Sequence, residues 1–325
     1  MKTSPLWLSL LLTGYATAAT LPATSPWVIN EGDDSYVYVT RVPTVGSVKI
    51  RSGYFRESTD AAVPFKGCVM YLEGLGDSMM NHVPYFTALS QAGYRVIAFD
   101  YMGQGGSEGS MNNTRIVDKV VPSLQISRIA ESIWEKYATM TDQVSGQNCA
   151  ISKKIVIGWS TGALAAYDMA HRNWADAVVL LTPGVFPKKM IGEAALNPML
   201  MLTGKPVISE RTLTRNDFEG STNPHYDRIN PATPVKVPFF SSNYLITAKL
   251  SRSWAVSPTV KGLVFASGVE DTYVDSVAST QKIQENTPHF KVVSFPGALH
   301  ELDNELPEVA TQVQKETVEF LATVN

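Results

Sequence analysis

The sequence predicts an α/β fold in which a mostly parallel central sheet is flanked by helices. Short, continuous apolar runs recur along its 325 residues, and such runs are typical of strands buried on both faces of a parallel sheet. Helical patterns lie between these runs, and this alternation favours right-handed crossover connections. The composition, with 44% hydrophobic and 18% charged residues, is that of a globular protein with a sizeable core.

The elements can be assigned in order along the chain. Residues 36–39 and 48–51 alternate like the two strands of an antiparallel hairpin, with Pro43 and Gly46 between them. Buried strands are expected at 69–72, 96–99, 155–157, 177–181 and 263–266, and residues 292–295 are a further strand candidate. Helices are expected at 79–92, 122–140, 161–174, 276–285 and 307–324.

One long stretch interrupts this alternation. Residues 186–257 contain seven prolines and little pattern of strands and helices. We interpret this stretch as an insertion that covers one edge of the sheet, between the core segments 19–185 and 258–325. Its methionine and aromatic residues suit either an adaptable apolar pocket or packing onto the core. They are Met190, Met199, Met201, Phe239, Phe240 and Tyr244.

The N-terminus differs from the rest of the chain. Residues 1–18 combine an early lysine, an apolar run at 6–12 and the small residues Ala16, Thr17 and Ala18, which together are typical of a secretory signal peptide. An amphipathic N-terminal helix is the alternative. We therefore expect an exported protein, either periplasmic or secreted, whose mature chain begins near residue 19.

The charge and the apolar runs narrow the range of partners. The net charge is −3 and basic residues do not cluster, so the sequence gives no support for nucleic-acid binding. No run of 18 or more apolar residues is present, and the sequence therefore predicts no membrane-spanning helix.

The two cysteines fit an oxidising compartment. Cys68 opens the predicted strand at 69–72, and Cys149 shortly precedes the strand at 155–157. If these strands are neighbours, both sulfur atoms lie near the same end of the sheet, where a bond between them would stabilise the fold by roughly 4 kcal/mol. Two buried free thiols are the alternative.

The strongest chemical signal is the pattern G-W-S-T-G at residues 158–162. It lies where the strand at 155–157 meets the helix at 161–174, which is the context in which a sharp turn exposes a nucleophilic serine. Such a turn is crowded, and this explains the small residues two positions on either side of the serine. Ser160 is therefore the candidate nucleophile.

A serine nucleophile needs a base, and the base needs an orienting carboxylate. His300 follows the last predicted strand, at the carboxyl edge where α/β sheets hold their sites. The other histidines are less well placed: His82, His171, His225 and His289. Asp271, which follows the strand at 263–266, is the leading carboxylate. Glu270 and Asp275 are alternatives, and Asp275 also suits a helix N-cap.

An oxyanion hole needs two preorganised N–H donors. We expect Thr161, directly after the serine, to supply one, and Leu75 in the glycine-bearing loop 73–77 to supply the other. The glycine-rich turn at 100–107 lacks the lysine and the following helix of a phosphate-binding loop. We expect neither a cofactor nor a metal ion.

Taken together, these residues resemble those of the α/β-hydrolase superfamily, most closely the monoacylglycerol lipase, lysophospholipase and serine aminopeptidase-like group. The resemblance rests on the pattern at 158–162, the turn at 100–107, Asp271 with Val274, and H-E-L-D-N-E at 300–305. It covers nearly all of the mature sequence, and the chain order serine, acid, histidine is the one expected of this fold. It implies that residues 186–257 form a lid over an acyl pocket.

Two positions depart from the family pattern. The oxyanion loop usually has His-Gly where this chain has Glu73 and Gly74, and the turn usually has an arginine where this chain has Met102. Neither position belongs to the triad. Both bear on the shape of the oxyanion region and on substrate preference.

The sequence thus favours an exported serine hydrolase that cleaves a small, lipid-like carboxylic ester of the monoacylglycerol or lysophospholipid type. Contact of the lid with a membrane surface, if any, is expected to be transient. The sequence predicts no particular oligomeric state. A serine aminopeptidase-like activity is the alternative; it needs an acidic group in the lid to bind the substrate ammonium, such as Glu193, Glu210 or Asp217. A catalytically inactive binding protein is a third hypothesis, which the complete triad disfavours.

Overall fold

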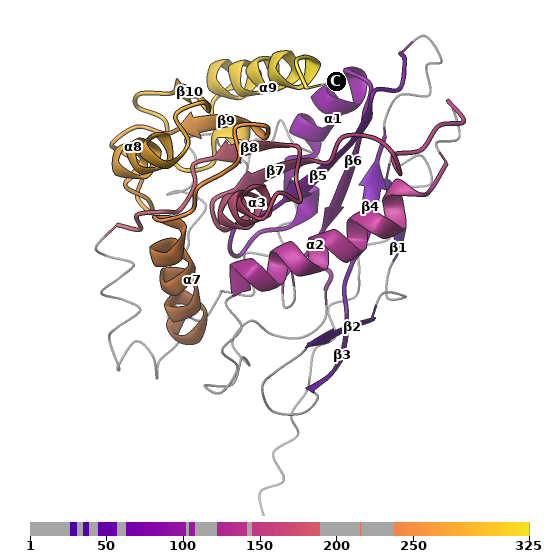
Figure 1. Ribbon diagram of the computed structural model, residues 1–325, viewed down its shortest axis with the longest axis horizontal. Coiled ribbons are helices and arrows are strands. Elements are labelled where there is room, and N and C mark those ends of the chain that lie inside the picture. The colour runs from indigo at the N-terminus through magenta and orange to yellow at the C-terminus, as the bar shows by residue number, and fades with distance from the viewer. Residues whose placement is uncertain are drawn as a thin grey trace, which may run out of the picture.

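An eight-stranded sheet lies at the centre of the described part of the protein (Figure 1). The computed structural model describes residues 27–30, 35–38, 45–56, 63–101, 104–107, 122–141, 145–188, 215 and 237–324. From edge to edge, the strands are β1 (Trp27–Asn30), β4 (Ser52–Phe55), β6 (Tyr94–Phe99), β5 (Gly67–Leu72), β7 (Ile155–Trp159), β8 (Ala177–Leu181), β9 (Lys261–Ala266) and β10 (Lys291–Ser294). β1 pairs antiparallel with β4, and β4 pairs antiparallel with β6, whereas all pairs from β6 to β10 are parallel.

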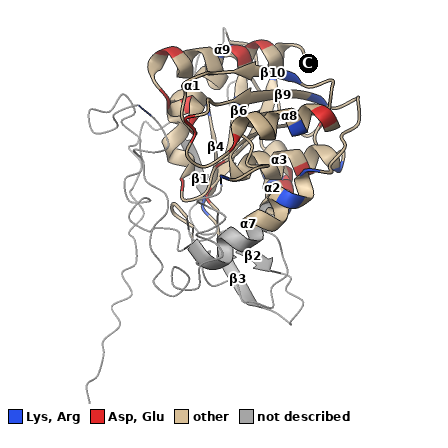
Figure 2. Ribbon diagram, turned by 90° about the vertical axis from the view of Figure 1, so that its left-hand side faces the viewer, with Lys and Arg blue, Asp and Glu red and all other residues tan. Residues whose placement is uncertain are grey.

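Helices cover both faces of this sheet (Figure 2). On one face lie α1 (Val83–Gln91), which the 3-10 turn η1 (Met79–His82) precedes, and α9 (Pro307–Ala322). On the other face the core includes side chains of α2 (Pro122–Ala138), α3 (Thr161–His171), α7 (Val237–Ser251) and α8 (Ser276–Asn286). The strands β4 to β8 are therefore buried on both sides.

The two cores explain the continuous apolar runs of the sequence. Successive side chains of a strand point to opposite faces of the sheet. In β5, Val69 and Tyr71 join the core beneath α1 and α9, whereas Met70 and Leu72 join the core beneath α2 and α3. Because both faces are buried, every position in such a strand is apolar rather than every second one.

The predicted α/β fold is confirmed. The five buried strands expected from the apolar runs are β5 to β9, and the further strand candidate at 292–295 is β10, an edge strand whose side chains are partly exposed. The expected hairpin forms a separate antiparallel pair of β2 (Ser35–Tyr38) and β3 (Val45–Lys49). The sequence analysis did not predict β1 or β4, because β4 reads S-G-Y-F and has neither a continuous apolar run nor a regular alternation. α3 ends at His171 rather than at residue 174, and Asn173 has a left-handed φ of 56° that a helix cannot continue.

A disulfide bond joins Cys68 to Cys149, with their Cα atoms 5.8 Å apart. β5 and β7 are neighbours in the sheet, with Val69 opposite Ile155, so the two cysteines lie at the same end of these strands. Both side chains are fully buried. The bond therefore ties together the starting ends of the two strands whose other ends lead into the candidate site.

Two predicted segments lie wholly or mostly outside the described residues. These are the signal peptide at 1–18 and the insertion at 186–257, of which the structure describes 186–188, 215 and 237–257. In the described part, no helix combines the length and the apolar character needed to cross a membrane.

Candidate active site

Ser160 lies on a sharp turn between β7 and α3. Its backbone has φ 53° and ψ −109°, a conformation that side chains other than glycine rarely adopt. A Cβ atom on Gly158 would lie 2.3 Å from the backbone oxygen of Gly162, so residues 158 and 162 must both be small for the turn to close. The backbone N–H of Ser160 donates to the oxygen of Leu181, at 2.9 Å, which anchors the turn to β8.

The structure brings Ser160, His300 and Asp271 together in one hydrogen-bonded chain. Oγ of Ser160 lies 2.8 Å from Nε2 of His300, and Nδ1 of His300 lies 2.8 Å from Oδ2 of Asp271. When Nδ1–H donates to the carboxylate, Nε2 of a neutral imidazole is left as an acceptor for the serine hydroxyl. His300 and Asp271 lie in the loops after β10 and β9, as the sequence predicts.

The carboxylate of Asp271 is held by four hydrogen bonds. Oδ2 accepts from Nδ1 of His300 and, at 2.6 Å, from Oγ of Ser267. Oδ1 accepts from the backbone N–H groups of Tyr273 and Val274, at 2.8 and 2.9 Å. Burial alone would raise the pKa of Asp271, but the charge of His300 and these hydrogen bonds outweigh it, so the pKa lies below its usual value. Asp271 is thus an anion beside His300.

The alternative carboxylates lie elsewhere. Glu270 is exposed to solvent. Asp275 is the N-cap of α8, where its side chain accepts from the backbone N–H of Ala278 at 3.0 Å. Neither residue has a described contact with His300 in this arrangement, whereas Asp271 bonds to it directly.

The other described histidines have different partners. Nδ1 of His171 lies 2.6 Å from the oxygen of Ala255, and Nε2 of His289 lies 3.2 Å from the oxygen of Val260. His82 is buried in a separate cluster of carboxylates, described below. His225 lies outside the described residues.

Two side chains that the sequence analysis did not single out hold the backbone of His300. Its carbonyl oxygen accepts from Nε1 of Trp159, at 3.0 Å, and from Oγ1 of Thr182, at 2.8 Å. Trp159 precedes the nucleophile, and Thr182 directly follows β8 at the same carboxyl edge. That position at the edge is the signal that could have identified Thr182.

The loop after β5 packs directly against the start of α3. A Cβ atom on Gly162 would lie 2.1 Å from the backbone oxygen of Leu72, and one on Gly74 would lie 2.4 Å from the ring of Trp159. The structure thus places Leu75 in a loop that touches the nucleophile turn, and Thr161 at the first position of α3. Their role as oxyanion donors stays a prediction.

The glycine-rich turn at 100–107 supports this loop through Gln104. Oε1 of Gln104 accepts from the backbone N–H of Gly76, at 2.7 Å. Its Nε2 donates to Oε1 of Glu73, at 2.8 Å, and to the oxygen of Gly74, at 3.2 Å. The turn itself is fixed by Asp100, which pairs with Arg51 and accepts from the backbone N–H groups of Met79 and Gly106. Met102 lies outside the described residues.

Glu73, which replaces the family's usual histidine, is fully buried in this loop. Its Oε1 accepts from Gln104 and from the backbone N–H of Tyr101, whereas its Oε2 has no hydrogen-bond partner among the described residues. Burial, together with the nearby charges of Asp100 and Asp77, raises the pKa of Glu73 well above its usual value. The surroundings of Glu73 therefore favour its protonated, neutral form.

The fold and this geometry can be compared with known proteins. The family model described as serine aminopeptidase, S33 (Hydrolase_4), matches residues 64–307. No curated protein sequence matched the chain.

Several solved structures share the fold. A monoacylglycerol lipase from Paleococcus ferrophilus is 18% identical, with a TM-score of 0.59 over 85% of this chain and 100% of that chain. A soluble variant of monoglyceride lipase from Saccharomyces cerevisiae, in complex with a substrate analogue, is 14% identical, with a TM-score of 0.61 over 90% of this chain and 96% of that chain. A thermostable carboxyl esterase from Bacillus coagulans is 15% identical, with a TM-score of 0.58 over 90% of this chain and 98% of that chain.

At these identities, the structural likeness shows the fold and not the substrate. The match to the family model establishes family membership, because it spans more than half of the chain and includes the pattern at 158–162, Asp271 and His300. The chain belongs to the serine aminopeptidase S33 (Hydrolase_4) family of α/β-hydrolases.

Proposed function

We propose that this protein is a serine hydrolase that cleaves carboxylic esters through an acyl-enzyme on Ser160. The observation that carries the proposal is the hydrogen-bonded chain from Ser160 through His300 to Asp271, with both links at 2.8 Å. Three groups in the order nucleophile, base and orienting carboxylate are what nucleophilic acyl transfer needs.

The reaction follows from the donors and acceptors of this chain of residues. Oγ of Ser160 attacks the ester carbonyl carbon while Nε2 of His300 takes the hydroxyl proton, and the same nitrogen then gives the proton to the departing alkoxide. Asp271 stays ionised, holds Nδ1–H toward itself and stabilises the imidazolium that forms. Water, deprotonated by His300, then attacks the acyl carbon and releases the carboxylic acid and the free serine.

The negative charge that develops on the carbonyl oxygen needs donors in place before the reaction begins. The backbone N–H of Thr161 lies in the first turn of α3, where the helix dipole also favours negative charge. The N–H of Leu75 is the second proposed donor. It is supported by the contacts of the loop 73–77 with Trp159 and Gln104.

We propose a lipid-like ester, of the monoacylglycerol or lysophospholipid type, as the substrate. Two proteins with the same fold are described as a monoacylglycerol lipase and a monoglyceride lipase. The many methionine and aromatic residues of the insertion at 186–257 suit a flexible apolar pocket for an acyl chain. The same insertion is the part of the chain that we expect to contact a membrane surface.

The description of the matched family favours a second candidate, a serine aminopeptidase-like peptidase. The triad serves amides and esters alike, so the geometry of Ser160 and His300 does not separate them. The peptidase hypothesis needs an acidic lid residue for the substrate ammonium, and its candidates Glu193, Glu210 and Asp217 lie outside the described residues.

We also propose that the protein acts outside the cytoplasm. The pattern at 1–18 is that of a signal peptide, and the bond between Cys68 and Cys149 suits an oxidising compartment. Cell fractionation with an antibody to the mature chain tests this proposal, since retention of the full-length chain in the cytoplasm would contradict it.

The function is tested with a substrate panel. Purified wild type, Ser160→Ala and Ser253→Ala are incubated with monoacylglycerols, lysophospholipids, p-nitrophenyl esters and aminoacyl p-nitroanilides. Ser253 is an exposed serine whose hydroxyl donates to the oxygen of Leu250, and it serves as the matched control. We expect ester hydrolysis by wild type and Ser253→Ala and none by Ser160→Ala. Hydrolysis confined to the anilides would replace the esterase with the peptidase, and equal activity of Ser160→Ala would overturn both.

A further inference from the structure

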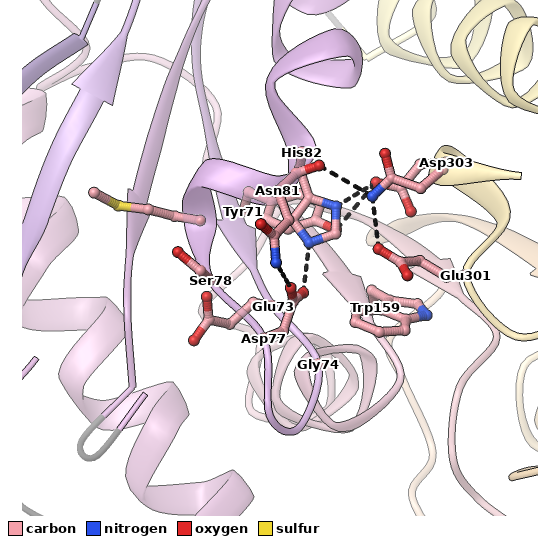
Figure 3. A network of polar contacts seen from close by, with 12 residues as sticks. Tyr71, Glu73, Gly74, Asp77, Ser78, Asn81, His82, Trp159, Glu301 and Asp303 are labelled. Carbon is pink, nitrogen blue, oxygen red and sulfur yellow. Dashed lines mark hydrogen bonds and ion pairs between the residues drawn. The ribbon is translucent and has the colours of Figure 1, made fainter. Parts of the chain in front are cut away.

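A second histidine, His82, is buried between two carboxylates (Figure 3). Its Nε2 lies 2.6 Å from Oδ2 of Asp77, and its Nδ1 lies 2.6 Å from Oδ2 of Asp303. The side chain of His82 is 0% exposed, and Asp77 and Asp303 are 5% and 2% exposed. Neither carboxylate was singled out by the sequence analysis.

The geometry fixes the charge of His82. A neutral imidazole has one N–H and can donate to only one of the two carboxylates, whereas an imidazolium donates to both. Burial alone would lower the pKa of His82, but the charges of Asp77 and Asp303 and their hydrogen bonds outweigh it and raise the pKa well above its usual value. The two short contacts and the direction of this shift thus both favour the imidazolium form of His82.

This cation joins the two loops on which the proposed chemistry depends. Asp77 ends the loop 73–77, which carries the proposed oxyanion donor Leu75. Asp303 lies in the 3-10 turn η3 (Leu302–Asn304), three residues after His300. A pair of charge-assisted hydrogen bonds through one rigid ring thus spans the gap between the oxyanion loop and the histidine loop.

Two asparagines reinforce the same link. Asn81 donates from Nδ2 to Oδ1 of Asp77, at 2.7 Å. Asn304 donates from Nδ2 to the backbone oxygen of Asn81, at 3.0 Å, and to Oε1 of Glu301, at 2.6 Å. Figure 3 shows the dashed lines that join Asn81 and His82 of η1 to the segment that carries Glu301 and Asp303, beside the ring of Trp159. The rings of His82 and Trp159 are 5.8 Å apart, and Trp159 bonds to the oxygen of His300.

We propose that the imidazolium of His82 is the positioning group that sets the oxyanion loop at its working distance from the His300 loop. The proposal rests on the proposed function, because it assigns roles to loops defined by that function. His82 acts through Asp77 and Asp303, and it does not touch the reacting atoms.

Other groups around His82 agree with this charge. The hydroxyl of Tyr71, from β5, lies 3.0 Å from Nδ1 of His82 and 3.4 Å from Oδ2 of Asp303. Glu301 is also fully buried, and burial together with the charge of Asp77 raises its pKa to about 8. Glu301 is thus mostly neutral at pH 7, which leaves two aspartates facing one cation.

A metal ion is the competing explanation for this cluster. Ligand atoms of Asp77, His82 and Glu301 lie within 4.8 Å of one another in the described structure. A metal would need a free lone pair on a ring nitrogen of His82. Both nitrogens already face carboxylate oxygens at 2.6 Å, which is the spacing of N–H donors, so the imidazolium accounts for the cluster without a metal.

The test replaces the cation while keeping a donor. In His82→Gln, the amide can donate to Asp77, but its oxygen then faces the carboxylate of Asp303. In His82→Gln with Asp303→Asn, the new amide at 303 donates to that oxygen, and a chain of hydrogen bonds in which Asp77 is the only charged group replaces the one centred on the imidazolium. Tyr85→Phe is the control, because it removes a different buried hydrogen bond, between Tyr85 of α1 and Thr317 of α9, and leaves the bonds of His82 to Asp77 and Asp303 in place.

Steady-state hydrolysis of a p-nitrophenyl ester, melting temperature and metal content are measured for each protein. A displaced catalytic group typically costs about a hundredfold in rate. We expect His82→Gln to lose tenfold or more in kcat with KM within about threefold of wild type, in the manner of a transition-state effect. We expect kcat of the double variant to exceed that of His82→Gln, so that the loss in log kcat relative to wild type shrinks by at least a third. Tyr85→Phe should lower the melting temperature and keep kcat.

Several results would overturn the proposal. They are an unchanged kcat in folded His82→Gln, a double variant no better than His82→Gln, or a stoichiometric metal whose chelation abolishes activity. Should His82→Gln fail to fold, Asp303→Ala cuts the link to the His300 loop and leaves the pair of His82 and Asp77. An unchanged kcat in Asp303→Ala would then contradict the proposal. A wild-type protein that hydrolyses no ester would instead overturn the proposed function. The failure of the proposal about His82 and the failure of the proposed function are therefore distinguishable.

Discussion

The start of α3 presses on the end of β5 so closely that a Cβ atom on Gly162 would lie 2.1 Å from the backbone oxygen of Leu72. This contact joins the turn that carries Ser160 to the loop that carries the proposed oxyanion donor. The glycine at the end of the pentapeptide is therefore required by a neighbour in the tertiary structure as well as by the turn itself.

Gly162→Ala is expected to damage both stability and activity. Because the methyl group meets backbone that cannot rotate away, we expect a loss of about 3 kcal/mol in the free energy of unfolding. Activity per folded molecule should also fall, since the loop 73–77 must move. Gly146→Ala is the control: a Cβ atom there meets nothing within 4 Å, and only its left-handed φ costs about 1 kcal/mol. Denaturant unfolding and ester assays on both variants check this, and equal losses in the two would refute it.

Asp271→Asn is expected to lower kcat by about 10⁴-fold while the fold persists. The amide at 271 can no longer hold Nδ1–H of His300 as an anion does, so Nε2 is no longer a free acceptor for Ser160. Glu270→Gln, a change at the neighbouring exposed carboxylate, should leave kcat within about twofold. A large loss in Glu270→Gln, or a mild one in Asp271→Asn, would show that the orienting carboxylate is wrongly assigned.

Glu301 is expected to make the protein less stable as the pH rises. Its folded pKa of about 8 lies above its value in the unfolded chain, near 4.5, so the folded state keeps a proton that the unfolded state has lost between these pH values. The free energy of unfolding therefore falls with rising pH across this window, by at most about 1.4 kcal/mol per pH unit. Burial and the charge of Asp77 are the main causes of the raised pKa.

Glu301→Gln isolates this contribution. The glutamine oxygen can still accept the hydrogen bond from Asn304, but it cannot ionise. We expect the difference in stability between the variant and wild type to move in favour of the variant from pH 5 to pH 8. Glu308→Gln, on the exposed first turn of α9, controls for the loss of one acidic side chain. A difference that stays constant with pH would contradict the prediction.

The bond between Cys68 and Cys149 is expected to stabilise the fold without taking part in the chemistry. The cysteines are 81 positions apart, and a loop of that length corresponds to roughly 4 kcal/mol on the chain-entropy model. Replacing both cysteines by alanine should lower the melting temperature and leave kcat of the folded protein within about threefold. A double variant as stable as wild type would contradict this estimate, and a selective loss of kcat would implicate the bond in the site.

The sequence was enough to predict what depends on local order along the chain. The parallel strands follow from apolar runs, and Ser160, Asp271 and His300 follow from their places after β7, β9 and β10, where carboxyl ends meet at one edge. The strand β4 was missed because its S-G-Y-F segment has no pattern of its own. Its burial comes from pairing with β6.

The supporting side chains were beyond the reach of the sequence because they depend on contacts between distant segments. His82 and Asp303 are 221 positions apart, and no spacing rule joins them. The sequence places His82 near the start of the helix predicted at 79–92, whereas in the structure His82 lies in η1 and its ring contacts two carboxylates. Thr182 and Trp159 likewise act on His300 from other strands, 118 and 141 positions away.

The central claim is that Ser160 is the nucleophile, and fluorophosphonate labelling tests it most directly. The probe forms a covalent bond only with a serine that its own active site activates, and mass spectrometry of the digested protein locates the adduct. The account predicts one adduct per native chain, on the peptide that contains Ser160, retained in Ser253→Ala and lost in Ser160→Ala and in heat-denatured protein. An adduct at another residue, or none on protein that still hydrolyses esters, would contradict it.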